Sequence, residues 1–280
     1  MTNISSLRSI LVHADASPQT TIRLQAATAL ARTHGACVRA CFAVLPVYMQ
    51  YPYSLSISVE VLGMLQDAEA NRSAHARAIF DQAVAAEAMA IEWSSTTDEP
   101  VRAFTRNAAC GDLCVLGQSD PDNEFRSDVP FDFVESVVIG CGRPSLVLPH
   151  HHVPADIGRV ALLAWKPTRE AAHALAGSLP LLQKADKVHV AVWNEGEDAP
   201  AEVCADIDRY LGLHGIDAEV HSYGAQSRDV GEYLLSLASD VSADLLVMGC
   251  YGHGRIREWV LGGATRSVLR SMTLPVLMAH

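Results

Sequence analysis

An internal repeat constrains the fold most strongly, because two copies of one pattern require two copies of one structural unit. The segment SILVHADASPQTTIRLQAATALARTHG, residues 9–35, aligns with VALLAWKPTREAAHALAGSLPLLQKAD, residues 160–186. Each segment has the pattern of an apolar strand, a polar turn and an amphipathic helix. The repeat therefore divides the chain of 280 residues into two halves of similar construction.

The later segments of the two halves match in the same order. Paired strands are predicted at 37–46 and 187–195, 90–96 and 217–224, 111–118 and 243–250, and 143–150 and 274–280. Helices are predicted at 59–89 and 201–213, and at 100–109 and 229–239. Short apolar strands that alternate with helices indicate parallel β-α-β units with right-handed crossovers. The predicted fold class is α/β, with two tandem doubly wound domains.

The predicted domains are residues 1–149 and 159–280, joined by the linker HHHVPADIG at 150–158. The histidines 150–152 are expected to be solvated, with metal binding as the alternative. The strands at 145–148 and 275–278 lie at equivalent sheet edges, which are liabilities unless covered. We predict that these two strands pair with each other across an intramolecular two-fold.

Composition excludes several classes of partner. Lys and Arg number 21 against 32 Asp and Glu, and the net charge of −11 argues against nucleic acid or an anionic membrane surface. No leader and no apolar run of about 18 residues is found, so a soluble, cytoplasmic protein is expected. Seven scattered cysteines predict free thiols, with Cys37, Cys41, Cys110 and Cys114 in the core.

The segment VMGCYGHGRIREWVLGGAT, residues 247–265, combines glycines, cations and a helix start. Backbone N–H groups at such a start can surround an anion. His253, Arg255 and Arg257 add positive charge in a chain that is otherwise acidic. The sequence therefore predicts a phosphate site here. Of the seven thiols, Cys250 is the best candidate for a reactive one, but the favoured interpretation is an inert small loop residue.

With this loop, the chain resembles a tandem universal stress protein, in which two copies of that domain are fused. Gly249, Gly252 and Gly262 form the Gly-x2-Gly-x9-Gly pattern, which follows ADLLVM and precedes SVLRSMTLPVLMAH. The resemblance covers nearly all of both halves. It implies a five-stranded parallel sheet with helices on both faces in each half, and an intramolecular pseudo-dimer. It leaves open a homodimer of the tandem chain.

The resemblance also implies a site for ATP or a related adenine nucleotide, with or without Mg²⁺, in the second half. The predicted nucleotide-binding residues are Lys166, Val192, Met248, Gly249, Gly252, Arg255, Gly262, Gly263, Ala264 and Thr265. Val192 matches an adenine contact, and the glycines match the phosphate neighbourhood. Two positions depart from the family pattern: Gly263 replaces a Ser or Thr, for which Thr265 compensates in part, and Lys166 replaces an acidic residue.

The first half departs from the pattern differently. Asp15 keeps the acidic position, but the loop after Gly117 lacks the later glycines and carries six acidic residues against Arg126 alone. Such a loop is expected to repel a polyphosphate. The nucleotide is therefore predicted to bind the second half and to avoid the first.

The predicted function is that of a stress-response or regulatory protein that binds an adenine nucleotide. No strong catalytic constellation accompanies the loop, so an enzyme is not expected. One alternative is a weak ATPase or autophosphorylating protein that uses Lys166 and His253. The other is a nucleotide-free interaction module or apolar-ligand binder, for which the helix at 59–89 and the tyrosine-containing insertion at 47–58 are the relevant features.

Overall fold

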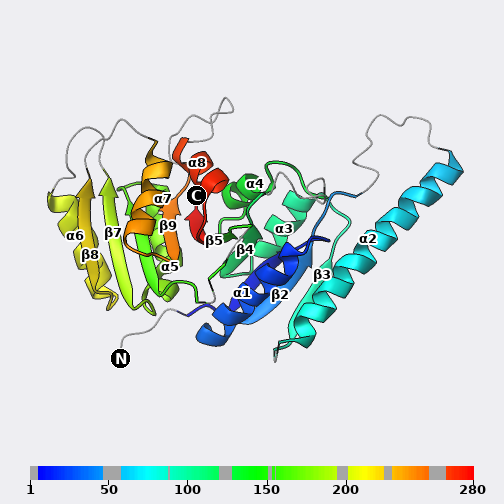
Figure 1. Cartoon of the computed structure of the whole chain (residues 1–280), viewed down its shortest axis with the longest axis horizontal. Coiled ribbons are helices and arrows are strands. Elements are labelled where there is room, and N and C mark those ends of the chain that lie inside the picture. The colour runs from blue at the N-terminus through cyan, green and yellow to red at the C-terminus, as the bar shows by residue number, and fades with distance from the viewer. Residues whose placement is uncertain are drawn as a thin grey trace.

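The computed structural model consists of two α/β halves that lie side by side (Figure 1). It describes residues 6–46, 58–87, 89–119, 128–150, 153–154, 156–193, 201–223, 229–251 and 263–280. Residues 47–57 of the tyrosine-containing insertion and most of the glycine loop, residues 252–262, lie outside the described residues. The predicted domain boundaries at 149 and 159 stay a prediction.

Strands and helices alternate through both halves. The first half contains β1 (Ser9–Ala14), α1 (Gln19–His34), β2 (Cys37–Phe42), α2 (Val59–Ala85), β3 (Ile91–Ser95), α3 (Pro100–Ala108), β4 (Leu113–Gly117), α4 (Phe133–Gly140) and β5 (Ser145–Leu148). The second half contains β6 (Val160–Trp165), α5 (Arg169–Leu182), β7 (Lys187–Trp193), α6 (Ala201–Leu213), β8 (Ala218–Tyr223), α7 (Val230–Asp240), β9 (Leu245–Gly249), α8 (Gly263–Ser271) and β10 (Val276–Ala279). The predicted alternation is confirmed.

All ten strands form one sheet in the order β3-β2-β1-β4-β5-β10-β9-β6-β7-β8. Each half supplies five parallel strands, and the halves meet where β5 pairs with β10 in the antiparallel sense. Leu277 lies opposite Leu146 in this pair, and Met278 lies opposite Ser145. The predicted pairing of the two terminal strands is therefore confirmed. We call the β5–β10 pair and the residues packed around it the seam.

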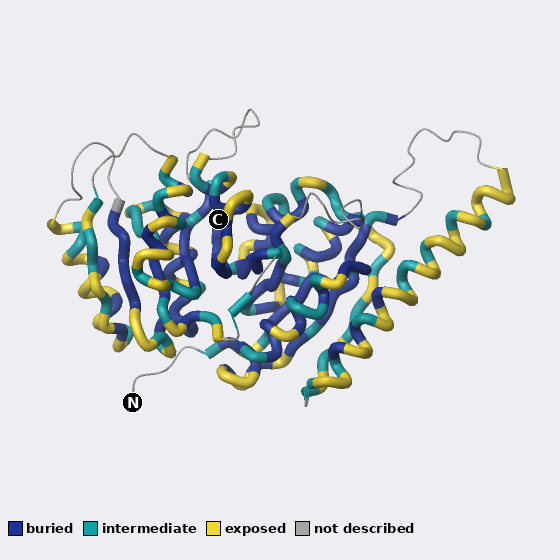
Figure 2. The backbone as a smooth tube through the Cα atoms, in the orientation of Figure 1, coloured by how far each residue is buried: buried dark blue, intermediate teal, exposed yellow. Residues whose placement is uncertain are grey.

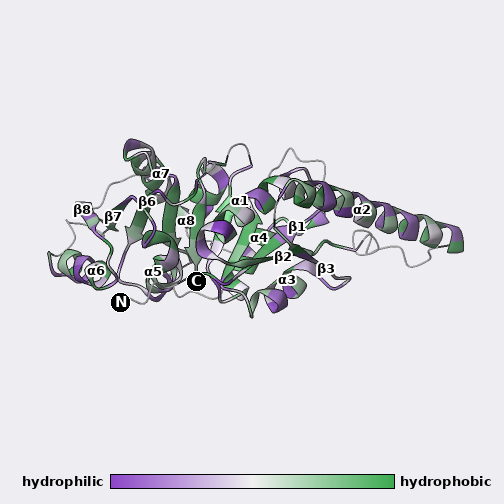
Figure 3. Cartoon of the chain, turned by 90° about the horizontal axis from the view of Figure 1, so that it is seen from below, coloured by the Kyte–Doolittle hydropathy of each residue, from purple (hydrophilic) through white to green (hydrophobic). Residues whose placement is uncertain are grey.

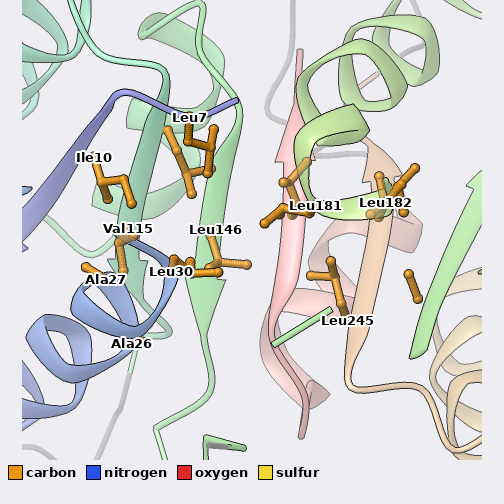
Figure 4. Close-up of a cluster of buried hydrophobic side chains, with 14 of the residues drawn as sticks. Leu7, Ile10, Ala26, Ala27, Leu30, Val115, Leu146, Leu181, Leu182 and Leu245 are labelled. Atoms are coloured by element: carbon orange, nitrogen blue, oxygen red, sulfur yellow. The ribbon is translucent and has the colours of Figure 1, made fainter. Parts of the chain in front are cut away.

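Helices cover both faces of the sheet, as the buried strands in Figure 2 and the apolar strands in Figure 3 indicate. One hydrophobic core lies under α1, α2, α5 and α6, and a second lies under α3, α4, α7 and α8. Both cores run across the seam. In Figure 4, Leu146 from β5 and Leu245 from β9 belong to one such cluster, with side chains of α1 and α5 around them. The two halves therefore share their interior.

Contacts outside the sheet also hold the halves together. A side chain at Gly177 in α5 would place its Cβ 2.8 Å from the ring of Pro144, so this helix lies directly on the residue before β5. The Gln118 amide donates to the carbonyl of Leu269 over 2.9 Å, and the Lys184 amine donates to that of Thr33 over 2.5 Å. The seam thus combines sheet pairing, close packing and polar contacts.

Helix α2 leaves the body of the molecule at its amino-terminal end (Figure 1). The side chain of Ser58 caps this end by accepting from the amide of Val61. Phe80 and Ala83 are buried near the other end, whereas Val59 and Met64 are 88% and 62% exposed. Only the carboxyl-terminal part of α2 therefore contributes to the core.

All seven cysteines are free thiols, as predicted. Cys41 and Cys114 are buried, but Cys37 and Cys110 are exposed, so the core assignment is wrong for one member of each pair. The reason is that each exposed cysteine lies at or before the start of its segment, outside the packed part. In the described part of the chain, no helix is long and apolar enough to cross a membrane.

Candidate functional site

The order of strands reverses between β6 and β9, and the carboxyl ends of these strands form the candidate site. In open α/β sheets, this point is where ligands bind. Lys166 directly follows β6, and Gly249 ends β9. Ala164 pairs with Met248 on one side of β6, and Trp165 pairs with Val192 on the other. The structure therefore brings Lys166, Val192, Met248 and Gly249 to one sheet edge.

Gly249 is required by packing. A Cβ atom at this position would lie 2.5 Å from the amide nitrogen of Ala171 and 2.6 Å from the carbonyl carbon of Glu170. Those backbone atoms belong to the first turn of α5, which Thr168 caps through the amide of Ala171. The first turn of α5 thus lies against the end of β9. Sequence reasoning found Gly249 as a loop residue and missed this packing role.

The two described residues that directly follow Gly249, Cys250 and Tyr251, pack in or against the hydrophobic core. Cys250 is 1% exposed, its thiol lies 3.3 Å from the carbonyl of Ala279, and burial raises its pKa to about 12. The structure therefore supports the favoured, inert interpretation of Cys250, because a buried, protonated thiol is a poor nucleophile. Tyr251 has a φ of 60°. Its buried hydroxyl finds no hydrogen-bond partner within the described part of the chain, and burial raises its pKa.

Helix α8 begins at the far side of the loop. Gly263 is exposed, and a Cβ there would meet no atom within 4 Å, whereas the Thr265 side chain is 3% exposed. Ala264 lies between them and its carbonyl is 2.6 Å from where a Cβ on Gly231 would stand, so α7 and α8 are in close contact. Ser267 donates to Asp229, the cap of α7, and lowers the pKa of that carboxyl. Gly252, Arg255 and Gly262 lie outside the described residues, so their predicted roles stay predictions.

The equivalent edge of the first half is filled by its own ion pair. The Asp15 carboxylate lies 2.8 Å from the guanidinium of Arg23, which is 5% exposed, and it also accepts from Ser17 and Thr20. A Cβ on Gly117 would lie 2.7 Å from Arg23 Nη1. Arg23 therefore lies over Gly117 and leaves a cavity of only about 70 Å³ beside them.

The charges in this first-half site are mutually compensated. Burial alone would raise the pKa of Asp15, but Arg23, His13 and hydrogen bonds from Ser17 lower it to about 2. Burial lowers the pKa of His13 to about 4, although Asp15 opposes the shift. Arg126 is the one cation within the acidic loop of the sequence, and the contribution of Arg23 was not predicted. The repeat aligns Arg23 with Ala174, so a change of residue type between the halves was the available signal.

Fold and site together define a doubly wound α/β protein built as a tandem, with a glycine-containing switch point in its second half. Residues 163–280 match the model of the universal stress protein family. That part of the chain belongs to the universal stress protein family.

One sequence relative and two solved structures show further similarity to this chain. A universal stress protein of Synechocystis sp. is 25% identical over 168 residues, which are 59% of this chain and 57% of the relative, so little more than half of that relative is matched. The crystal structure of a universal stress protein from Archaeoglobus fulgidus is 17% identical, with a TM-score of 0.74 over 98% of this chain and 96% of that one. A functionally unknown protein from Pseudomonas aeruginosa is 15% identical, with a TM-score of 0.58 over 100% and 94%. The two structures share the fold of the whole chain.

Proposed function

We propose that the second half binds ATP or a related adenine nucleotide at the edge between β6 and β9, and that the chain acts as a nucleotide-responsive stress or regulatory protein. The observation that carries this proposal is the position of Gly249 at the switch point, directly against the first turn of α5. Helix α8 begins at Gly263, at the other end of the glycine loop that follows Gly249. Two helix starts supply N–H groups and partial positive charge, which suit phosphate.

The charges of the two halves support the same assignment. Lys166 provides a cation where β6 ends, and the repeat places Asp15 at the equivalent position of the first half. Asp15 is already paired with Arg23, whose guanidinium occupies the space over Gly117. A polyphosphate would have to displace this buried pair, and an unpaired buried charge is costly. Nucleotide is therefore expected in the second half alone.

Calorimetric titration of ATP tests the proposal. Gly252→Asp introduces a carboxylate into the glycine loop and should abolish binding, and Lys166→Ala should weaken it by about tenfold to a hundredfold, the worth of one charge-assisted contact. The matched control is Asp15→Ala at the equivalent position, which should leave the affinity unchanged. Binding that survives Gly252→Asp but disappears in Asp15→Ala would place the nucleotide in the first half and contradict the proposal. Release of ADP and phosphate during the titration would favour the weak ATPase.

One observation favours a second candidate, the binding of an apolar ligand. A cavity of about 760 Å³ lies between α2 and the carboxyl ends of β2 and β3, with Phe42, Val44, Leu62 and Leu65 in its lining. Its size is typical of small-molecule sites. Native mass spectrometry of protein purified without added nucleotide separates the candidates. A copurified adenine nucleotide would support the nucleotide site, and a copurified lipid would support the apolar-ligand site.

A further inference from the structure

Three side chains with metal-binding atoms converge on the outermost strands of the second half. His189 in β7 lies directly opposite Glu219 in β8, and His221 follows two residues later in β8. Side chains two apart on a strand share a face, as do directly paired ones. All three therefore project from one face of the sheet. Ala191, the next residue on that face of β7, packs in the core under α7.

The distances between the three donor atoms fit one metal ion. His189 Nδ1 lies 3.3 Å from Glu219 Oε2 and 3.5 Å from His221 Nε2, and the remaining pair is 3.9 Å apart. Zinc binds nitrogen and oxygen at about 2.0–2.2 Å, so two ligands of a tetrahedral ion stand about 3.3–3.5 Å apart. Two of the three separations agree with this value, and the third needs a shift of a few tenths of an ångström in an exposed carboxylate.

Lys187 holds the carboxylate of Glu219 from the side away from the histidines. Lys187 contacts Oε1 over 2.9 Å and leaves Oε2 facing the histidines. An outer hydrogen bond of this kind orients a ligating carboxylate.

We propose that His189, Glu219 and His221 bind a divalent transition-metal ion, with Zn²⁺ as the best match and water as the fourth ligand. Two imidazoles and one carboxylate are a known donor set of zinc sites that keep an open position. The site lies toward the amino ends of β7 and β8, away from the candidate nucleotide edge. It links β8, the outer strand of the sheet, to its neighbour β7. A bound ion would therefore hold the edge strand β8 against β7.

Cobalt(II) titration of EDTA-treated, nucleotide-free protein tests the proposal, because Co²⁺ in a site of nitrogen and oxygen ligands absorbs visible light without the intense thiolate band that a cysteine site would add. We expect one Co²⁺ per chain, displaced by Zn²⁺. His221→Ala and Glu219→Gln should each weaken binding by at least tenfold, since even changes in the outer shell of a metal site cost 10- to 100-fold. Zn²⁺ should also raise the Tm of the wild type and leave that of the two variants unchanged.

Two controls make the result specific. His214→Ala removes a partly buried histidine elsewhere in the same half, and replacement of the histidines at 150–152 by alanine removes the other candidate metal-binding segment. Both should bind Co²⁺ as the wild type does. Absence of the cobalt spectrum in the wild type, its persistence in His221→Ala and Glu219→Gln, or its loss on replacing 150–152 would each overturn the proposal. Glu219 is exposed and changes to its isostere, so circular dichroism should show an intact fold in that variant.

Discussion

At the scale of single residues, two glycines of the candidate site play opposite structural roles. Gly249→Ala would push a methyl group into the backbone of α5, and we expect it to lower the free energy of unfolding by about 3 kcal/mol, the upper end for overpacking. The methyl group of Gly263→Ala would enter open space, so this variant should change the free energy of unfolding by less than about 1 kcal/mol. Urea unfolding of both variants checks this. Equal stability of the two variants would show that the first turn of α5 moves away from β9 without cost.

His13 makes the stability of the first half depend on pH. Burial lowers its pKa from 6.5 to about 4, so below pH 6.5 the unfolded chain takes up a proton that the folded chain refuses. The free energy of unfolding is therefore unaffected by His13 well above pH 6.5 and decreases as the pH falls from 6.5 towards 4. At pH 4.5 this decrease amounts to about 2–3 kcal/mol. Urea unfolding at pH 7.5 and 4.5 should show a smaller loss for His13→Gln than for the wild type. The same change at exposed His75 is the control, and equal losses in all three proteins would refute this prediction.

The position of the candidate site is predicted by the repeat, whereas the contacts around it are not. The repeat placed Lys166 and Gly249 at strand ends, and parallel strands bring such ends to one edge. The pairing of Asp15 with Arg23 was not predicted, because Arg23 lies in the second turn of a helix whose rotation over the sheet depends on packing. The burial of Cys250 depends on its contact with Ala279 of β10, which its place beside a glycine does not indicate.

At the scale of elements, α2 divides into a core end and an exposed end. The Phe80 ring lies 4.8 Å from that of Trp93, under the guanidinium of Arg77, and is 3% exposed. Phe80→Ala should therefore cost about 3–5 kcal/mol, the usual range for a buried aromatic residue. Met64→Ala, in the exposed part, should change stability by less than about 0.5 kcal/mol. Thermal unfolding compares the two, and a similar loss at Met64 would mean that something covers the exposed end.

Most elements were predictable because their patterns recur in both halves. The predicted helix at 201–213 matches α6, and the predicted helices at 100–109 and 229–239 match α3 and α7 within a residue. The prediction for α2 ran to residue 89, but the helix ends at Ala85. Apolar residues continue past that point, and the sequence does not show that they leave the helix to enter β3.

At the scale of the whole molecule, the seam makes the two halves depend on each other. Leu277 is fully buried and pairs with Leu146, so Leu277→Asp would place an unpaired charge in the shared interior. We expect backbone amides in both β4 and β9 to exchange faster with solvent in this variant. Leu213→Asp, at a leucine that is 76% exposed, is the matched control and should leave exchange unchanged. Faster exchange in β9 alone would show that the first half is stable without the seam.

The seam also fixes how the molecule responds to dilution. β5 and β10 belong to one chain, so their pairing is an intramolecular event with an effective concentration set by the connection between the halves. Two separate subunits joined through the same strands would part when diluted, because the stability of such an assembly follows mass action. Here the pairing keeps the same equilibrium at any protein concentration. A cell can therefore hold this protein at very low abundance without loss of the pairing between its two halves.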